Sequence, residues 1–162
     1  MVAIAEQPEQ QITRYAGEFA AAIEQFRQLS GATDDTDLVD RIEAYVAGFE
    51  QAECPVNHHF FDGLYSRETF VPGGTVFVTE EHMTTHPLFL MQGTITLWTK
   101  GSEGITVHAP CVVRTTPGTR RVVFAHSDTV GITVHATAEQ DPETIREQIT
   151  SQRPNPFLPC LG

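Results

Sequence analysis

The sequence predicts a mainly β protein: a small antiparallel barrel or jelly roll, preceded by a helical hairpin and followed by a short helix. In the first third of the chain, apolar residues recur every three or four positions, as on amphipathic helices. From residue 54 onward, β-branched and aromatic residues dominate and turn residues interrupt them at short intervals. We therefore expect a helical hairpin in residues 1–53, a barrel in 54–138, and a short helix with a tail in 139–162.

Two helices are expected in the hairpin. The first lies in QITRYAGEFAAAIEQFRQLS, and its apolar stripe consists of Ile12, Tyr15, Phe19, Ile23, Phe26 and Leu29. Gly31 suits its end, and Asp34, Asp35 or Thr36 can cap the next helix. The second stripe consists of Leu38, Ile42, Tyr45, Val46 and Phe49. Two interpretations stay open: the hairpin covers one side of the barrel, or it forms a contact between subunits.

Roughly seven or eight short strands are expected in the barrel. The candidates are GLYSRETFV, TVFVTEEH, PLFLMQGTITLWTK, ITVHAP, CVVRTTPGTRRVVFAH and VGITVHAT. Gly93 interrupts the third candidate and marks a bend or bulge. After the barrel, Asp141 is a good N-cap and Pro142 fits the first position of a helix. The tail RPNPFLPCLG holds three prolines, so it is either a flexible end or an arm laid on a neighbouring subunit.

Composition excludes several classes of function. The formal net charge is −11, and residues 1–53 alone hold three basic and eleven acidic residues, a net charge of −8. Such a charge repels nucleic acid, and no apolar run is long enough to span a bilayer. The start MVAIAEQPEQ does not resemble a signal peptide, so we expect a cytoplasmic protein. The three cysteines are widely spaced, which indicates free thiols.

The stretch VTEEHMTTHPLFLMQG carries the clearest candidate site. His82 and His86 are four residues apart, but Pro87 and the strand-like surroundings argue against a helix. We expect this segment to end one strand, turn, and enter the next. Residues of like parity share a face of a strand, so Glu80 is expected to point the same way as His82. Glu80, His82 and His86 are therefore predicted to converge on one metal ion inside the barrel.

This arrangement resembles the cupin motifs. In the first motif, Glu80 and His82 take the two histidine positions and His86 takes the glutamate position, between Gly74 and Gly93. The second motif keeps the turn at Pro117 and Gly118, but Arg121 stands where cupins carry a histidine. The resemblance therefore implies a double-stranded β-helix with a divalent transition metal, here Fe, Mn, Ni or Zn. His135 or, less favourably placed, His126 is expected to complete the ligand set.

A closer resemblance covers roughly residues 53 to 147, from ECPVNHHFFDGLYSRE to GITVHAT and the helix that follows. This part is similar to a family of small cupin-type proteins of bacteriophages and prophages. The family segment reads H-K-T-E-H-P, and this chain keeps both histidines and the proline but has Thr85 where the family usually shows glutamate. The resemblance implies a fold and a phage setting, in the infected cell or in the virion, but no reaction.

Three further residues are predicted to bind a ligand in the barrel: Arg121, Tyr65 and Arg67. Arg121 suits an anionic ligand, although pairing with Glu68 is an equal alternative. Tyr65 and Arg67 fit the mouth of the cavity, with cross-strand packing as the simpler role. No catalytic residue is assigned. Two functions follow: a metal-dependent protein that acts on or binds a small molecule, or a non-catalytic phage scaffold. We expect a homo-oligomer through the barrel edge or the N-terminal helices, or contacts with other virion proteins.

Overall fold

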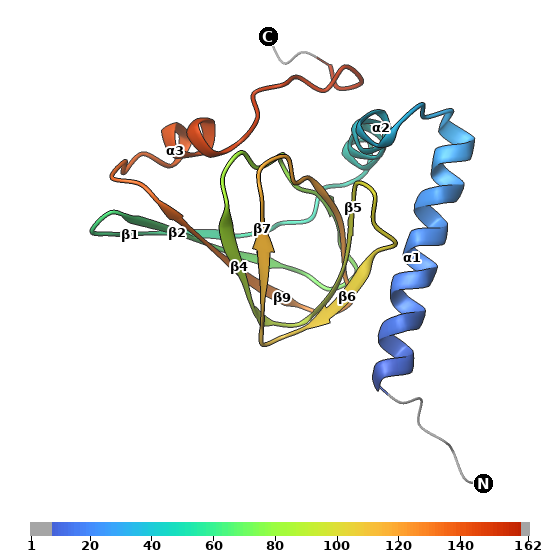
Figure 1. Cartoon of the computed structure of the whole chain (residues 1–162), viewed down its shortest axis with the longest axis horizontal. Helices are drawn as coiled ribbons and strands as arrows, with labels where there is room; N and C mark the ends of the chain where they lie inside the picture. The colour runs from blue at the N-terminus through green and yellow to red at the C-terminus, as the bar shows by residue number, and fades with distance from the viewer. Residues whose placement is uncertain (1–7, 160–162) are drawn as a thin grey trace, which may run out of the picture.

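The computed structural model describes residues 8–159, with side chains from residue 14 onward. In this part of the chain, nine strands form two facing antiparallel sheets with the orders β1-β2-β9-β4-β7 and β3-β8-β5-β6 (Figure 1). The strands are β1 Val56–Phe61, β2 Leu64–Val71, β3 Val76–Val78, β4 His86–Gln92, β5 Thr94–Thr99, β6 Ile105–His108, β7 Cys111–Thr115, β8 Arg121–Ala125 and β9 Thr129–Ala136. The predicted jelly roll with N-terminal helices and a short C-terminal helix is confirmed.

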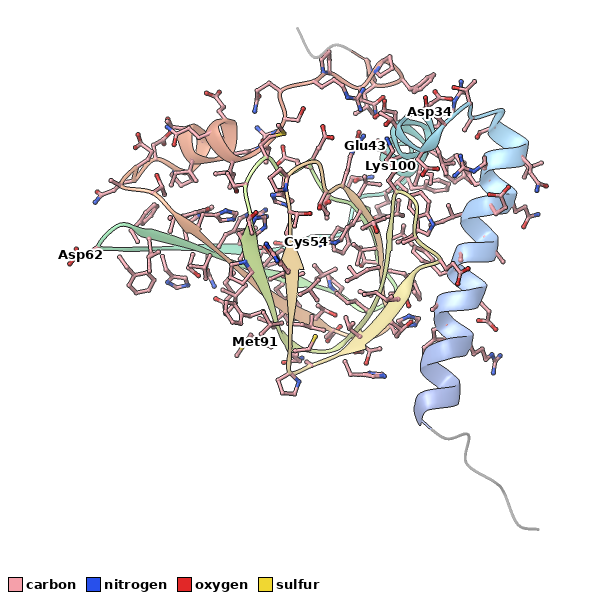
Figure 2. All side chains as sticks on the ribbon, viewed as in Figure 1. Asp34, Glu43, Cys54, Asp62, Met91 and Lys100 are labelled. Atoms are coloured by element: carbon pink, nitrogen blue, oxygen red, sulfur yellow. The ribbon has the colours of Figure 1, made fainter. Side chains whose placement is uncertain are left out.

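Two strands differ from the expectation. β1 was not among the candidates, because its sequence VNHHFF has no alternation of apolar residues and lies largely exposed. It pairs with β2 in a hairpin that projects from the barrel (Figure 1), with Asp62 at its tip (Figure 2). β3 ends at Val78, so the predicted strand through Glu80 and His82 stops short of both residues. Gly93 does mark a bend: its φ is +93°, and an added Cβ would lie 2.6 Å from the Asp128 carbonyl oxygen.

The two N-terminal helices lie against the outside of the four-stranded sheet. α1 (Pro8–Ser30) runs beside β5 and β6 (Figure 1). α2 (Asp35–Ala47) packs on β3. Gly31 ends α1 with a φ of +68°. The Asp34 carboxylate accepts a hydrogen bond of 2.9 Å from the Asp37 amide and so caps α2. The hairpin thus covers the barrel; a role between subunits stays a prediction, and the Ile12 side chain lies outside the described part.

The apolar core has two parts, one under the helices and one between the sheets. The first consists of Ile23, Leu38, Val39, Ile42, Trp98 and Val122, and the second of Val71, Leu90, Ile95, Leu97, Val123 and Ala125. The second part lies toward the ends of β2, β4 and β8. The beginnings of the same strands carry buried polar residues instead, namely Tyr65, His86 and Arg121. One end of the barrel is therefore apolar and the other is polar.

The C-terminal segment lies on its own chain. α3 (Pro142–Ile149) begins as predicted, since the Asp141 carboxylate accepts from the Thr144 amide at 2.8 Å. The tail then crosses α2, where Arg153 binds the Asp40 carboxylate and the Phe157 ring lies 4.4 Å from the Arg41 guanidinium. The described tail thus packs on α2 of its own chain, and a contact with a neighbouring subunit stays a prediction. Cys160 lies outside the described residues. No helix in residues 8–159 is long and apolar enough to cross a membrane.

Candidate functional site

Three histidines from three segments meet at the polar end of the barrel. The ring centroids of His86 and His135 are 4.2 Å apart, those of His82 and His86 are 4.5 Å apart, and those of His82 and His135 are 6.3 Å apart. His86 and His135 are buried, with 3% and 4% of their surface exposed. His135, rather than His126, therefore joins the pair that the sequence predicts.

The backbone explains why these rings meet. β4 and β9 are antiparallel neighbours with Leu88 opposite Thr133, and the same register continued by two residues brings His86 opposite His135. His82 lies in the loop between β3 and β4, where its backbone bridges to Thr119 and to Thr150. The turn at Pro117 and Gly118 holds it there, because the Gly118 amide donates 2.8 Å to the His82 carbonyl. Sheet register and one turn thus fix the cluster.

Each of the three rings has a buried nitrogen without a hydrogen-bond partner. These atoms are Nδ1 of His82, Nε2 of His86 and Nδ1 of His135. Nδ1 of His86 lies 3.1 Å from the Thr84 carbonyl, which can only accept, so this nitrogen carries the proton and Nε2 keeps its lone pair. Buried polar atoms are normally hydrogen-bonded, so three unpartnered nitrogens in one place require an explanation.

All three imidazoles are held in the neutral form. Burial is the main cause, and together with His86, Arg121 and Arg67 it lowers the pKa of His82 to about 4. Burial, His86, His82 and Arg67 lower the pKa of His135 to about 3. Burial also lowers the pKa of His86, although its bond to Thr84 opposes this. Neutral imidazole is the form that coordinates metal ions.

The predicted ligand-binding residues surround this cluster from both sheets. Arg121 at the start of β8 is 6% exposed, and its guanidinium donates to Thr115 Oγ1 at 3.0 Å. Tyr65 on β2 is buried, its ring centroid lies 6.2 Å from that of His135, and burial raises the pKa of its hydroxyl. Its hydroxyl oxygen lies 2.6 Å from Nδ1 of His58 on β1, a contact that crosses the hairpin diagonally. Arg67 lies on β2 with its side chain exposed.

Glu80 is not part of the cluster, which corrects the predicted ligand set. Because β3 ends at Val78, strand parity does not extend to Glu80, and its carboxylate accepts from Arg146 Nε at 2.7 Å on the surface. The alternative ligand His126 lies elsewhere, with Nε2 2.7 Å from Thr96 Oγ1 and its ring stacked on Tyr15.

The alternative partner for Arg121 is also excluded by placement. Glu68 Oε2 instead accepts from Asn57 Nδ2 at 2.9 Å, in the projecting hairpin. Sequence reasoning missed the contact between His58 and Tyr65, because β1 itself was not predicted and the hairpin register was therefore unknown.

Within residues 14–159, no group of three or more His, Cys, Asp or Glu side chains is arranged so that it could hold a metal ion.

Comparisons with known proteins support the fold. The chain is similar in structure to ectoine synthase from P. lautus, with a TM-score of 0.50, 13% identity, and coverage of 64% of this chain and 78% of that one. A cupin-2 domain containing protein from Shewanella frigidimarina aligns with a TM-score of 0.44, 15% identity, and coverage of 59% and 91%. No family model and no curated protein matches the sequence. The molecule is thus a jelly-roll barrel with a buried histidine cluster, and its fold is similar to that of ectoine synthase.

Proposed function

We propose that this protein binds a divalent transition-metal ion through His82, His86 and His135, and a small molecule beside that ion. One observation carries the proposal: three neutral imidazoles from three segments each leave a buried nitrogen without a partner. Nitrogen ligands of this kind suit Fe, Mn, Ni or Zn. The cluster has no carboxylate, so the proposed ligand set is three nitrogens rather than the two histidines and Glu80 expected from the sequence.

Three imidazole nitrogens are suitable ligands for a transition-metal ion. In the present side-chain positions, however, no group of described residues could hold a metal ion. The imidazole rings must therefore turn when an ion binds. Two histidine contacts limit this movement. The bond from His86 Nδ1 to the Thr84 carbonyl fixes the ring and leaves Nε2 unpartnered, and the bridges at His82 fix its backbone. If these three side chains held an ion, they would leave open positions for a bound small molecule, and the ion would supply Lewis-acid chemistry there.

Elemental analysis of the purified whole chain tests this proposal. We expect about one transition-metal ion per chain when the protein is produced with Fe, Mn, Ni or Zn supplied. His135→Ala should lose the metal and keep a cooperative unfolding transition. His126→Ala is the matched control, because His126 is a partly buried histidine that bonds to Thr96 away from the cluster. Metal-free wild-type protein, or equal metal content in His135→Ala, would refute the proposal.

A second candidate function is an assembling scaffold, which the resemblance to phage cupins suggests and which would place the protein in the virion rather than the cytoplasm. One observation favours it: the projecting β1–β2 hairpin exposes Phe60, Phe61 and Leu64, of which Phe61 is 63% exposed. A second apolar group is exposed at Tyr45 on α2 and at Phe49, which follows this helix. Light scattering of wild type, Phe61→Ser and Tyr45→Ser tests it. A discrete oligomer that one variant dissociates supports assembly, and a monomeric wild type rejects self-assembly.

A further inference from the structure

Arg121 is a buried cation that binds no carboxylate of residues 14–159. Its Nη1 donates to Thr115 Oγ1 at 3.0 Å, and its Nη2 donates to the Arg114 carbonyl at 3.3 Å. Both acceptors are neutral. Arginine cannot escape burial by losing its proton, as lysine can, so the charge stays in the barrel. Buried charges in proteins are normally paired with an opposite charge or bind one.

Other arginines of the described chain show what is missing. Arg27, Arg41, Arg146 and Arg153 each bind a carboxylate, and none of the ion pairs within residues 14–159 involves Arg121. The contrast is sharpest at the preceding residue. Arg120 points to the other side of the barrel wall, where it binds both Asp40 and Glu43. The more deeply buried of these two neighbours is therefore the one without a counter-ion.

The surroundings of Arg121 add further positive potential. The charge of Arg121 acts on His82 and His86, and the charge of Arg67 acts on His82 and His135 from the opposite sheet. Within residues 14–159, no carboxylate is among the causes that shift the pKa of the three histidines. The polar end of the barrel is thus positive, although the chain as a whole has a net charge of −11.

Unused donors lie at the same end. The guanidinium has five N–H groups and uses one on each of two nitrogens, so about three stay free. The Thr84 hydroxyl oxygen, beside the carbonyl that fixes His86, is buried without a partner. A planar carboxylate matches the fork of a guanidinium in two parallel hydrogen bonds.

We propose that Arg121 anchors the carboxylate of a small organic acid, which lies against the cluster of His82, His86 and His135. This deepens the proposed function and takes from it only that the small molecule binds inside the barrel. Arg67 contributes longer-range attraction, and the carboxylate supplies the charge that Arg121 lacks.

Calorimetric titration of the whole, chelator-treated chain tests this without a metal. The probes are acetate and malonate, with inorganic phosphate as a tetrahedral comparison, at constant ionic strength and pH. We expect a carboxylate to bind wild type and to bind Arg121→Gln at least about tenfold more weakly. Arg121→Lys, which keeps the charge and loses the fork, should fall between the two. Arg14→Gln is the matched control: it removes one exposed arginine charge from α1, outside the barrel, and should leave the affinity unchanged.

Three results would overturn the inference. They are wild type that binds neither acid at the highest soluble concentration, equal affinity in wild type and Arg121→Gln, and phosphate bound as tightly as the carboxylates. If Arg121→Gln does not fold, the same comparison is made with Arg121→Lys. The titration is done without metal, so the two proposals can fail separately. If the protein holds no metal, carboxylate binding at Arg121 is still tested by the titration. If no carboxylate binds, the metal site is still tested by the elemental analysis.

Discussion

Arg120 and Arg121 are adjacent in the chain and meet opposite environments on the two sides of one barrel wall. Outside, Arg120 and Arg153 share the buried carboxylate of Asp40, so that every charge has a partner. Inside, the acceptors of Arg121 among residues 14–159 are all neutral, and three histidines leave nitrogens unpartnered. Outside the barrel, the folded chain itself supplies every ion-pair partner. Inside the barrel, Arg121 and the three histidines keep unused donors and acceptors, as expected of a binding site before its ligand binds.

The largest effect on stability is expected from removing the carboxylate of Asp40 outside the barrel. Asp40→Ala removes a carboxylate that is 3% exposed and leaves Arg120 and Arg153 without their partner. The free energy of unfolding should fall by roughly 3 to 5 kcal/mol, as when one member of a buried ion pair is deleted. Urea denaturation measures this. A loss below about 1 kcal/mol would show that the network is no more than a surface ion pair.

Lowering the pH should affect the histidine cluster inside the barrel before it affects the ion pairs outside. Both His82 and His135 have folded pKa values, about 4 and about 3, below the ordinary 6.5, so the unfolded chain binds more protons between these values. Stability of the metal-free protein should therefore be complete above pH 7 and decrease toward pH 4, on the order of 3 kcal/mol for His82 alone. Denaturation at a series of pH values measures it.

The control for acidification is His135→Phe, which should flatten this dependence, whereas His59→Gln on the exposed hairpin should not. The ion pairs of Asp40 outside the barrel should weaken only at a lower pH than the histidine cluster. Arg153 and Arg120 hold the pKa of Asp40 below its ordinary 3.8 against the opposing effect of burial, so its contribution is lost only as pH falls below that value. Equal slopes in wild type and His135→Phe between pH 7 and pH 4 would contradict the neutral cluster.

The smallest effect is expected at Glu80. Its ion pair with Arg146 is exposed on both sides, 44% and 53%, so Glu80→Gln should change the free energy of unfolding by less than about 0.5 kcal/mol. Metal affinity should not change, because this carboxylate lies away from the cluster. Calorimetric titration with Zn²⁺ checks the second point. A tenfold or greater loss of affinity would return Glu80 to the ligand set.

The sequence predicts the fold better than it predicts the site, for physical reasons. Hydrophobic periodicity and turn residues are local signals, so the helices, their caps at Asp34 and Asp141, and most strands are predictable. Parity is also local, but it holds only while a strand continues. The argument for Glu80 depended on a strand that ends at Val78, two residues too early.

Contacts between distant residues have no such local signal. His135 is reachable only through the register of β4 with β9, which the sequence could suggest but not fix. Asp40 binds Arg120 and Arg153, which lie 80 and 113 residues further along the chain. The tail could therefore not be assigned to α2 from its prolines. The lack of a carboxylate at Arg121 is likewise visible only when every neighbour is in place.

The contrast between the two arginines is tested most directly by replacing each with methionine and measuring unfolding of the ligand-free protein. Methionine keeps much of the volume and removes the charge. Arg121→Met should raise the free energy of unfolding by about 1 kcal/mol, because an uncompensated buried charge is removed, while Arg120→Met should lower it by about 2 kcal/mol. If both variants are destabilised equally, Arg121 is a structural residue and the barrel interior is already complete without a ligand.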